Sequence, residues 1–109
     1  MASFKKPGRP VRGSRTGRPV MALLDLLGRR WTLRIFWELR GENMTFRALR
    51  EACEAVSPTV LNQRLHELRE AKLVELGAED GYVLTPLGRE LLVLLEPITD
   101  WSSRWAKTL

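Results

Sequence analysis

The run Ser-Pro-Thr-Val-Leu-Asn-Gln-Arg-Leu, which begins at Ser57, constrains the fold more than any other part of this sequence. Ser57 is a good helix N-cap, because its hydroxyl can accept a hydrogen bond from a backbone N–H of the first turn. Pro58 suits the first helical position, where its missing N–H costs nothing. Leu61, Leu65 and Leu68 follow at steps of four and three, which predicts one apolar stripe. The sequence therefore predicts an amphipathic helix from Ser57 to about residue 71.

The face of this helix opposite the leucines carries polar side chains of short or medium length: Thr59, Asn62, Gln63 and His66. Asn and Gln can bind adenine with two hydrogen bonds, and Thr can contact a thymine methyl group. We predict that these residues read DNA bases in the major groove. A plain solvent-facing role stays open for each of them, most of all for His66, which lies further along the helix.

Helical patterns at residues 20–28, 31–39 and 45–53 come before this helix, and two short strand patterns at residues 73–76 and 81–84 come after it. Thr45 can cap the third of these helices, in which Phe46, Leu49 and Cys53 fall at near-helical spacing. Thr85 and Pro86 then open a last helix. This order predicts a mainly α fold with a small β-hairpin wing, which is a winged helix-turn-helix. In such a fold the third helix positions the fourth in the major groove.

The last helix has a heptad-like apolar seam, which predicts packing against another helix. Trp101 and Trp105 could instead line a ligand cavity, but aromatic residues at seam spacing favour an interface. Pro97 interrupts the pattern, so we expect a bent or two-piece helix. The residues predicted to form a dimer interface are Leu91, Leu94, Ile98, Trp101 and Trp105.

Charge divides the chain of 109 residues into two parts. Residues 1–18 hold six of the 18 basic residues and none of the 13 acidic ones, so the rest of the chain is nearly neutral. We predict a disordered basic N-terminal arm over 1–18 and one domain over 19–109, since the arm has too few apolar groups to fold alone. Candidates for phosphate or minor-groove contact are Arg9, Arg12, Arg15 and Arg18.

The arm has three open interpretations. Gly-Arg-Pro at 8–10 recurs at 17–19 and resembles the core of AT-hook peptides, which lie in the minor groove. The arm can also be a solvated tail with general attraction to phosphates, or a flexible leader. Within the domain, we expect phosphate contacts from Thr45, Arg47, Ser57 and Arg64, with ordinary helix-surface roles as the alternative.

Other classes of function find little support in the sequence. It contains one His, one Cys and no phosphate-binding glycine loop, so we expect no catalytic residues, no metal site and no cofactor. The longest apolar run is too short to cross a membrane, and no secretory signal is present. We therefore expect a cytoplasmic protein. Cys53 lies on an apolar helix face, where a small core residue is favoured over a reactive thiol.

Several motifs together resemble the HxlR-type transcriptional regulators, a group of the MarR-like superfamily. They lie at 24–32, 46–49, 57–65, 68–74 and 82–88, and the resemblance covers about residues 19–105. It implies a dimeric DNA-binding repressor or activator, with the dimer built from the first and last helices. A small-molecule effector, which the sequence does not identify, is compatible with such a regulator.

Two features depart from the resemblance. Many members of this family carry a cysteine before the proline that opens the first helix, and here that position is Arg18, so thiol sensing at that site is excluded. Family wings are often longer and basic, whereas here the wing tip holds Glu79 and Asp80. These carboxylates would be repelled by phosphates, so we expect the arm to replace the wing in binding DNA.

The leading prediction is a homodimer that binds double-stranded DNA at specific sequences. Two alternatives stay open. The winged helix could be a protein-interaction module, which the neutral domain and acidic wing favour slightly. It could also be a non-specific architectural DNA binder that depends on the arm.

Overall fold

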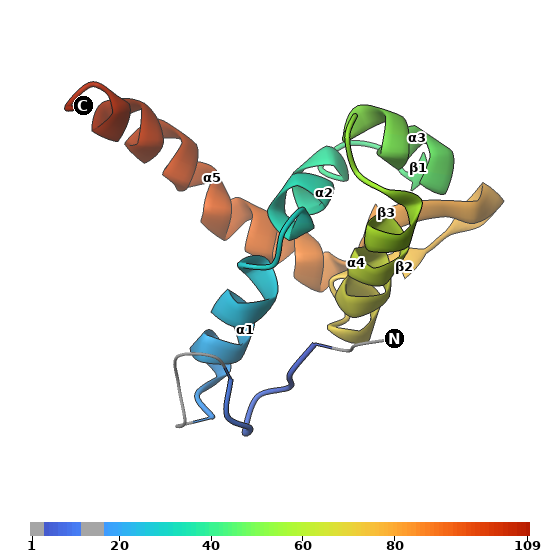
Figure 1. Cartoon of the computed structure of the whole chain (residues 1–109), viewed down its shortest axis with the longest axis horizontal. Helices are drawn as coiled ribbons and strands as arrows, with labels where there is room; N and C mark the ends of the chain where they lie inside the picture. The colour runs from blue at the N-terminus through green and yellow to red at the C-terminus, as the bar shows by residue number, and fades with distance from the viewer. Residues whose placement is uncertain (1–3, 12–16) are drawn as a thin grey trace.

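The structure is a computed structural model that describes residues 4–11 and 17–109. These residues form five α-helices and a small sheet that lies at one edge of the domain (Figure 1). The helices are α1 (Pro19–Leu27), α2 (Thr32–Glu38), α3 (Phe46–Ala52), α4 (Pro58–Glu70) and α5 (Pro86–Ala106). The strands are β1 (Met44–Thr45), β2 (Val74–Leu76) and β3 (Gly81–Leu84), and a 3₁₀ turn, η1 (Ala78–Asp80), joins the last two.

The sheet is antiparallel with strand order β1-β3-β2, so the hairpin is the wing and β1 is its third strand. Val74 lies opposite Leu84 in the hairpin, and Met44 lies opposite Tyr82 on the other side of β3. The predicted winged helix-turn-helix is confirmed. The strand β1 was not predicted, because two residues are too few for a recognisable strand pattern.

Three helices begin where side-chain caps were predicted. The hydroxyls of Thr45, Ser57 and Thr85 accept hydrogen bonds from the backbone N–H of the residue three positions later, at 3.1, 3.1 and 3.0 Å. Pro58 and Pro86 occupy the first turn of α4 and α5. Local sequence therefore determines where α3, α4 and α5 begin.

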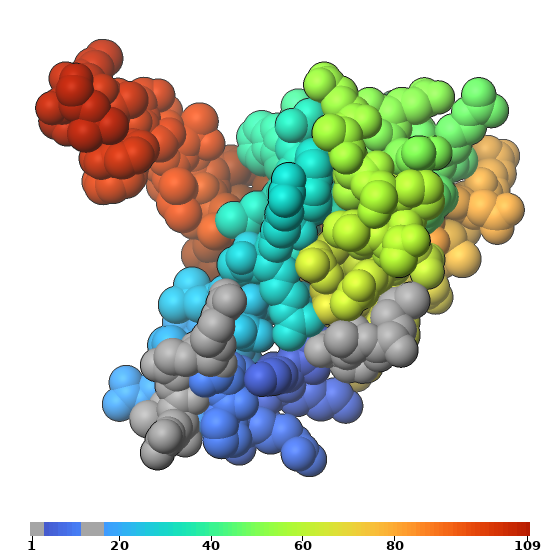
Figure 2. Space-filling view, in the orientation of Figure 1, coloured from blue at the N-terminus to red at the C-terminus, as the bar shows by residue number. Residues whose placement is uncertain are grey.

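The last helix is continuous through Pro97, so it is not in two pieces, while a bend at Pro97 stays a prediction. The φ angle of proline is compatible with a helix, and its ring removes a single backbone hydrogen bond. The 21 residues of α5 span about 31 Å at 1.5 Å per residue. Its N-terminal half packs on the domain, and its C-terminal half projects away from it (Figures 1 and 2).

The core lies between the helices and one face of the sheet. Leu61, Leu65 and Leu68 are fully buried, which confirms the apolar stripe predicted for α4. Large buried side chains packed with them come from α1, from α2 and the residue after it, from α3 and from the sheet: Leu26, Ile35, Phe36, Leu39, Leu49 and Val74. One face of α4 therefore belongs to the core, and the opposite face lies on the surface.

A buried carboxylate fixes α4 to α1 and to the turn that follows it. Glu67 is 1% exposed and pairs with Arg29 through one oxygen and with Arg64, at 3.1 Å, through the other. Arg29 also contacts Asp25 of α1 at 3.2 Å. Arg64 donates from Nε to the backbone carbonyl of Arg30 at 2.8 Å. This Glu67 network joins α1, the α1–α2 turn and α4.

The described part of the N-terminal segment contacts the domain. Phe4 packs against the core, Val11 is buried, and the backbone N–H of Gly8 donates to the carbonyl of Gly17 at 2.8 Å. The predicted boundary after residue 18 and the disorder of the arm stay predictions.

The Glu67 network predicts a large effect of one substitution. Glu67→Gln leaves Arg64 and Arg29 without their shared carboxylate, and should lower the free energy of unfolding by about 2 kcal/mol or more. Denaturant unfolding of the full chain measures this. Glu51→Gln is the control, because Glu51 pairs with Arg47 on the surface at 3.4 Å. Equal stability of the two variants would contradict a structural role for Glu67.

Candidate nucleic-acid interface

An open groove lies at the N-terminal end of α4, on the surface that the core leaves free. It has a volume of about 550 Å³ and is lined by Phe46, Pro58, Thr59, Asn62 and Gln63. Thr59 and Asn62 are exposed, and Gln63 is half-buried. Three of the four residues predicted to read bases therefore share one groove, which we call the α4 groove.

The predicted phosphate contacts on α3 and α4 lie at the helix starts. Thr45 and Ser57 are exposed, although both hydroxyls already cap their helices. The Arg47 side chain is 91% exposed, and its Nε lies 3.4 Å from Oε1 of Glu51. The helix starts also present backbone N–H groups and the positive end of the helix dipole, both of which favour anions.

The structure separates His66 from the α4 groove. His66 lies seven residues after Thr59, which is about 10 Å along the helix axis. Its Nε2 lies 2.7 Å from the Glu70 carboxylate, one turn further on. His66 lines a different groove, at the C-terminal end of α4.

Arg64 points toward the domain instead of toward solvent. Its side chain is 16% exposed, and its nitrogens bind the Glu67 carboxylate and the Arg30 carbonyl. A phosphate contact would require these bonds to open, so we leave Arg64 out of the proposed interface. The sequence did not indicate this, because Glu67 falls among charged residues that resemble a solvated helix face.

The arm and the wing differ in charge. Arg9 and Arg18 are exposed, while Arg12 and Arg15 lie outside the described residues. Glu79 and Asp80 are both exposed at the wing tip, with φ angles of 55° and 57°. The short acidic tip predicted from the sequence is present, and it is not suited to binding phosphates.

The apolar seam of α5 is largely uncovered. Leu91 is half-buried against the domain, whereas Leu94 is 73% exposed and Ile98 is 55% exposed. Trp101 and Trp105 are also exposed, and their rings stack with centroids 6.0 Å apart. On α1, Val20 and Leu24 are exposed as well. These side chains form an apolar surface on the first and last helices.

Cys53 is a core residue at the end of α3. Its side chain is buried, and burial raises the pKa of the thiol, with the nearby Arg34 acting in the opposite direction. A raised thiol pKa lowers the thiolate fraction and hence the reactivity. Over residues 4–11 and 17–109, no cluster of His, Cys, Asp and Glu could hold a metal ion, and no helix is long and apolar enough for a membrane span.

Phe46 is a groove residue that sequence reasoning missed. Its spacing with Leu49 and Cys53 suggested the core, but its half-buried ring also forms a wall of the α4 groove. The signal that could have revealed this is its position directly after the Thr45 cap. The first residue of α3 lies where α3 and α4 meet.

A winged helix-turn-helix with polar side chains on the exposed start of α4 defines a protein of the DNA-binding transcription-regulator class. The family model described as HxlR-like helix-turn-helix matches residues 26–109. The chain belongs to this family of transcriptional regulators.

Two curated relatives agree with this assignment. An uncharacterized HTH-type transcriptional regulator of Methanocaldococcus jannaschii is 29% identical over 91 residues, 78% of this chain and 83% of the relative. The uncharacterized HTH-type transcriptional regulator YvaP of Bacillus subtilis is 30% identical over 88 residues, 75% of this chain and 82% of YvaP. The family and these relatives are regulators, not enzymes.

Solved structures share the fold. The quinone-bound YodB of B. subtilis has a TM-score of 0.73 and 27% identity, covering 78% of this chain and 94% of YodB. A protein described as a possible HxlR family transcriptional factor from Thermoplasma volcanium has a TM-score of 0.69 and 27% identity, covering 78% of this chain and 82% of its own.

Proposed function

We propose that this protein is a homodimer that binds specific double-stranded DNA sites and regulates transcription from them. Family membership already implies DNA binding. The observation that carries the finer proposal is the α4 groove, where Thr59, Asn62 and Gln63 lie together at the exposed start of a helix rigidly joined to the core. A major groove about 12 Å wide admits such a helix.

In this proposal the three polar side chains read base edges, and the surrounding groups contact phosphates. Asn62 and Gln63 suit adenine, and Thr59 and Phe46 suit the methyl group of thymine. Arg47 and the capped starts of α3 and α4, at Thr45 and Ser57, would fix the register on the backbone.

The uncovered seam of α5 supports dimerisation. The C-terminal half of α5 extends beyond the domain (Figure 2). Its exposed apolar side chains are unfavourable in water unless another surface covers them. The exposed Val20 and Leu24 of α1 and a shallow groove of about 260 Å³, which includes Leu23 and Leu94, continue this surface. A second copy that pairs through α1 and α5 would cover it, and its twofold would place two α4 helices on successive half-sites.

The basic arm would supply general attraction to DNA. In α4, Arg64 is held by Glu67, and the wing tip is acidic, so neither of these supplies a free cation to the phosphates. Arg9, Arg12, Arg15 and Arg18 of the arm can make phosphate or minor-groove contacts and raise affinity at any sequence.

Gln63→Ala should weaken binding to the specific site by about 1–3 kcal/mol and relax the preference at one base position. Fluorescence anisotropy on a footprinted genomic site and its single-base variants measures this. Glu96→Gln, an exposed change on α5 far from the groove, is the control. Unchanged affinity and preference in Gln63→Ala would remove Gln63 from the reading surface.

Ile98→Glu should convert the dimer into monomers, because it places a charge at the centre of the seam. Sedimentation velocity measures the oligomeric state, and circular dichroism checks that the helices persist. Val93→Glu is the control, since Val93 is also exposed on α5 but lies off the seam. A wild-type chain that sediments as a monomer would refute the proposed dimer.

Replacing Lys5, Lys6 and Arg9 together with Gln should weaken binding to all DNA sequences and flatten the dependence of log K on log salt by about one unit per lost phosphate contact. Titrations at several salt concentrations measure this slope. This variant keeps Phe4 and its packing, unlike deletion of residues 1–18. An unchanged slope would show that these three cations do not contact DNA.

The same titrations separate the two other functions. Equal affinity for unrelated sequences would indicate an architectural DNA binder. No binding to genomic DNA at moderate salt would indicate a protein-interaction module.

A further inference from the structure

Residues 4–11 lie against a small apolar cleft formed by α1 and by the turn that joins α4 to β2. The cleft has a volume of about 180 Å³. Phe4 and Pro7 line it from the N-terminal segment, and Ala71 and Leu73 line it from the turn. In Figure 1 the segment runs from near the end of α4 to the start of α1. We call residues 4–11 the strap and this space the strap cleft.

The strap is held by apolar side chains and by one backbone hydrogen bond. The half-buried Phe4 packs against the core, and Val11 is buried. The Gly8 N–H donates to the Gly17 carbonyl at 2.8 Å, just before α1 begins. A Cβ atom at Gly17 would lie 2.8 Å from the Gly8 carbonyl carbon, and φ at Gly17 is 69°, so this close approach requires glycine. The glycines of the two Gly-Arg-Pro repeats therefore meet in the folded chain.

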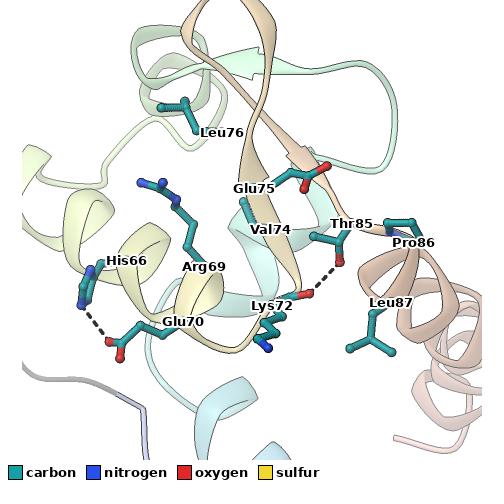
Figure 3. Close-up of a pocket in the computed structure, with 10 residues that line it drawn as sticks. All are labelled: His66, Arg69, Glu70, Lys72, Val74, Glu75, Leu76, Thr85, Pro86 and Leu87. Carbon is teal, nitrogen blue, oxygen red and sulfur yellow. Dashed lines mark hydrogen bonds and ion pairs between the residues drawn. The ribbon is translucent and has the colours of Figure 1, made fainter.

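The turn between α4 and β2 is a fixed wall of the strap cleft. The Thr85 hydroxyl donates to the Lys72 carbonyl at 2.7 Å (Figure 3), and the Thr85 N–H donates to the Leu73 carbonyl at 3.0 Å. These bonds join the turn to the residue that caps α5. A side chain that packs on the turn is therefore held in position relative to α5.

The other wall, α1, is a short helix that depends on its neighbours. It has nine residues, and a helix of this length is marginal by itself. The end of α1 is tied to α4 through Asp25 and the Glu67 network. Nearer its start, Ala22 and Leu23 line the strap cleft. Phe4 therefore lies where it can fix the first half of α1 against the turn.

The strap cleft shares residues with the apolar surface that we assign above to a second copy. Leu23 of α1 and Leu73 of the turn line the strap cleft. Both also line the shallow groove that reaches Leu91 and Leu94 of α5. Because protein interiors are closely packed, the positions of these two shared leucines depend on what fills the cleft.

We propose that the strap positions α1 for pairing with a second copy, and that Phe4 is the positioning residue. This inference rests on the homodimer proposed above and gives the N-terminal segment a further role in it. Phe4 docks in the strap cleft, fixes the first half of α1 against the turn, and so holds Leu23 beside the seam of α5. When the strap leaves, the surface for the second copy is no longer preformed, and the ordering cost of pairing rises.

Docking leaves the cations of the strap available to DNA. Lys5, Lys6 and Arg9 are exposed, and within residues 4–11 and 17–109 no carboxylate forms an ion pair with any of them. The strap therefore docks through its apolar residues and presents its charges to solvent. Its role in pairing is compatible with the phosphate contacts proposed for the arm.

Docking of the strap and pairing of two copies should favour each other. Ordering the strap costs backbone entropy, and of its residues only Phe4 is half-buried and only Val11 is buried. We therefore expect the docked and released states to be close in free energy. By linkage, the factor by which docking strengthens the dimer equals the factor by which pairing favours docking.

The first test measures the dissociation constant of the dimer by sedimentation equilibrium of the full chain without DNA. Phe4→Ala should weaken the dimer about tenfold, which is within the usual range for coupled sites. Phe4→Leu keeps an apolar side chain and should restore most of the affinity. Lys5→Ala, an exposed change on the same strap, is the control and should pair normally. Thermal unfolding of each variant confirms that it is folded.

Gly17→Ala releases the strap without changing Phe4. The added Cβ atom opposes the close approach to Gly8, so this variant should weaken the dimer as Phe4→Ala does. Gly41→Ala is the matched control, because an added Cβ atom there meets nothing within 4 Å. A Gly17→Ala dimer as tight as the Gly41→Ala dimer would count against the strap.

Hydrogen exchange of the Gly8 amide measures docking itself, because this N–H bonds to Gly17. Exchange should be slowed in the wild-type dimer. In the monomeric variant Ile98→Glu it should be about tenfold faster, since docking then lacks the support of the second copy. A residue that only packs would not give this reciprocal effect.

Three results would overturn the inference. These are equal dimer affinity in Phe4→Ala and Lys5→Ala, an unprotected Gly8 amide in the wild-type dimer, or equal Gly8 exchange in the wild type and Ile98→Glu. If the wild-type chain is a dimer that Phe4→Ala leaves unchanged, this inference fails alone. If the wild-type chain stays monomeric, the proposed dimer fails, and this inference fails with it.

Discussion

The rest of the structure depends on the buried contact of Glu67 with Arg29 and Arg64. A carboxylate removed from water is costly unless it is paired, so these side chains hold α4 in one position against α1 and the α1–α2 turn. The leucines of α4 stabilise its packing on the core, and the ion pairs fix the orientation of the helix. A helix held in this way presents its outer face in a fixed orientation, and a preformed surface has a lower ordering cost on binding.

The outer face of α4 is divided along its length. At its start, Thr59, Asn62 and Gln63 line a groove that suits base edges. At its end, Arg69 borders a groove with an apolar lining shared with the wing and α5. The two grooves therefore lie at opposite ends of one helix. α5 is divided similarly, with its first half packed on the domain and its second half uncovered.

Much of this arrangement follows from local chemistry. Thr45, Ser57 and Thr85 predicted three helix starts, because a hydroxyl followed by a good first turn satisfies the free N–H groups. The leucines of α4 predicted its buried face, and the order of elements predicted the wing. Other features could not be predicted, because they depend on contacts between residues far apart in the sequence. β1 exists because β3 lies beside it, and Arg64 points inward because Glu67 is buried there. His66 lies apart from the α4 groove because that groove forms at the start of the helix.

The sequence by itself determined the winged helix-turn-helix, the starts of α3, α4 and α5, the apolar seam of α5 and the concentration of positive charge before residue 19. These depend on periodicity and on neighbours a few residues apart, which a linear pattern records. The tertiary structure alone decided which charged residues of α4 are buried and which are exposed, and where a groove forms between the end of α4, β2 and the start of α5. Those properties depend on burial and on pairs such as Arg29 and Glu67, which lie 38 positions apart in the chain. The sequence gives the sign of each charged residue, but its burial and its ion pairs are determined only when the helices pack together.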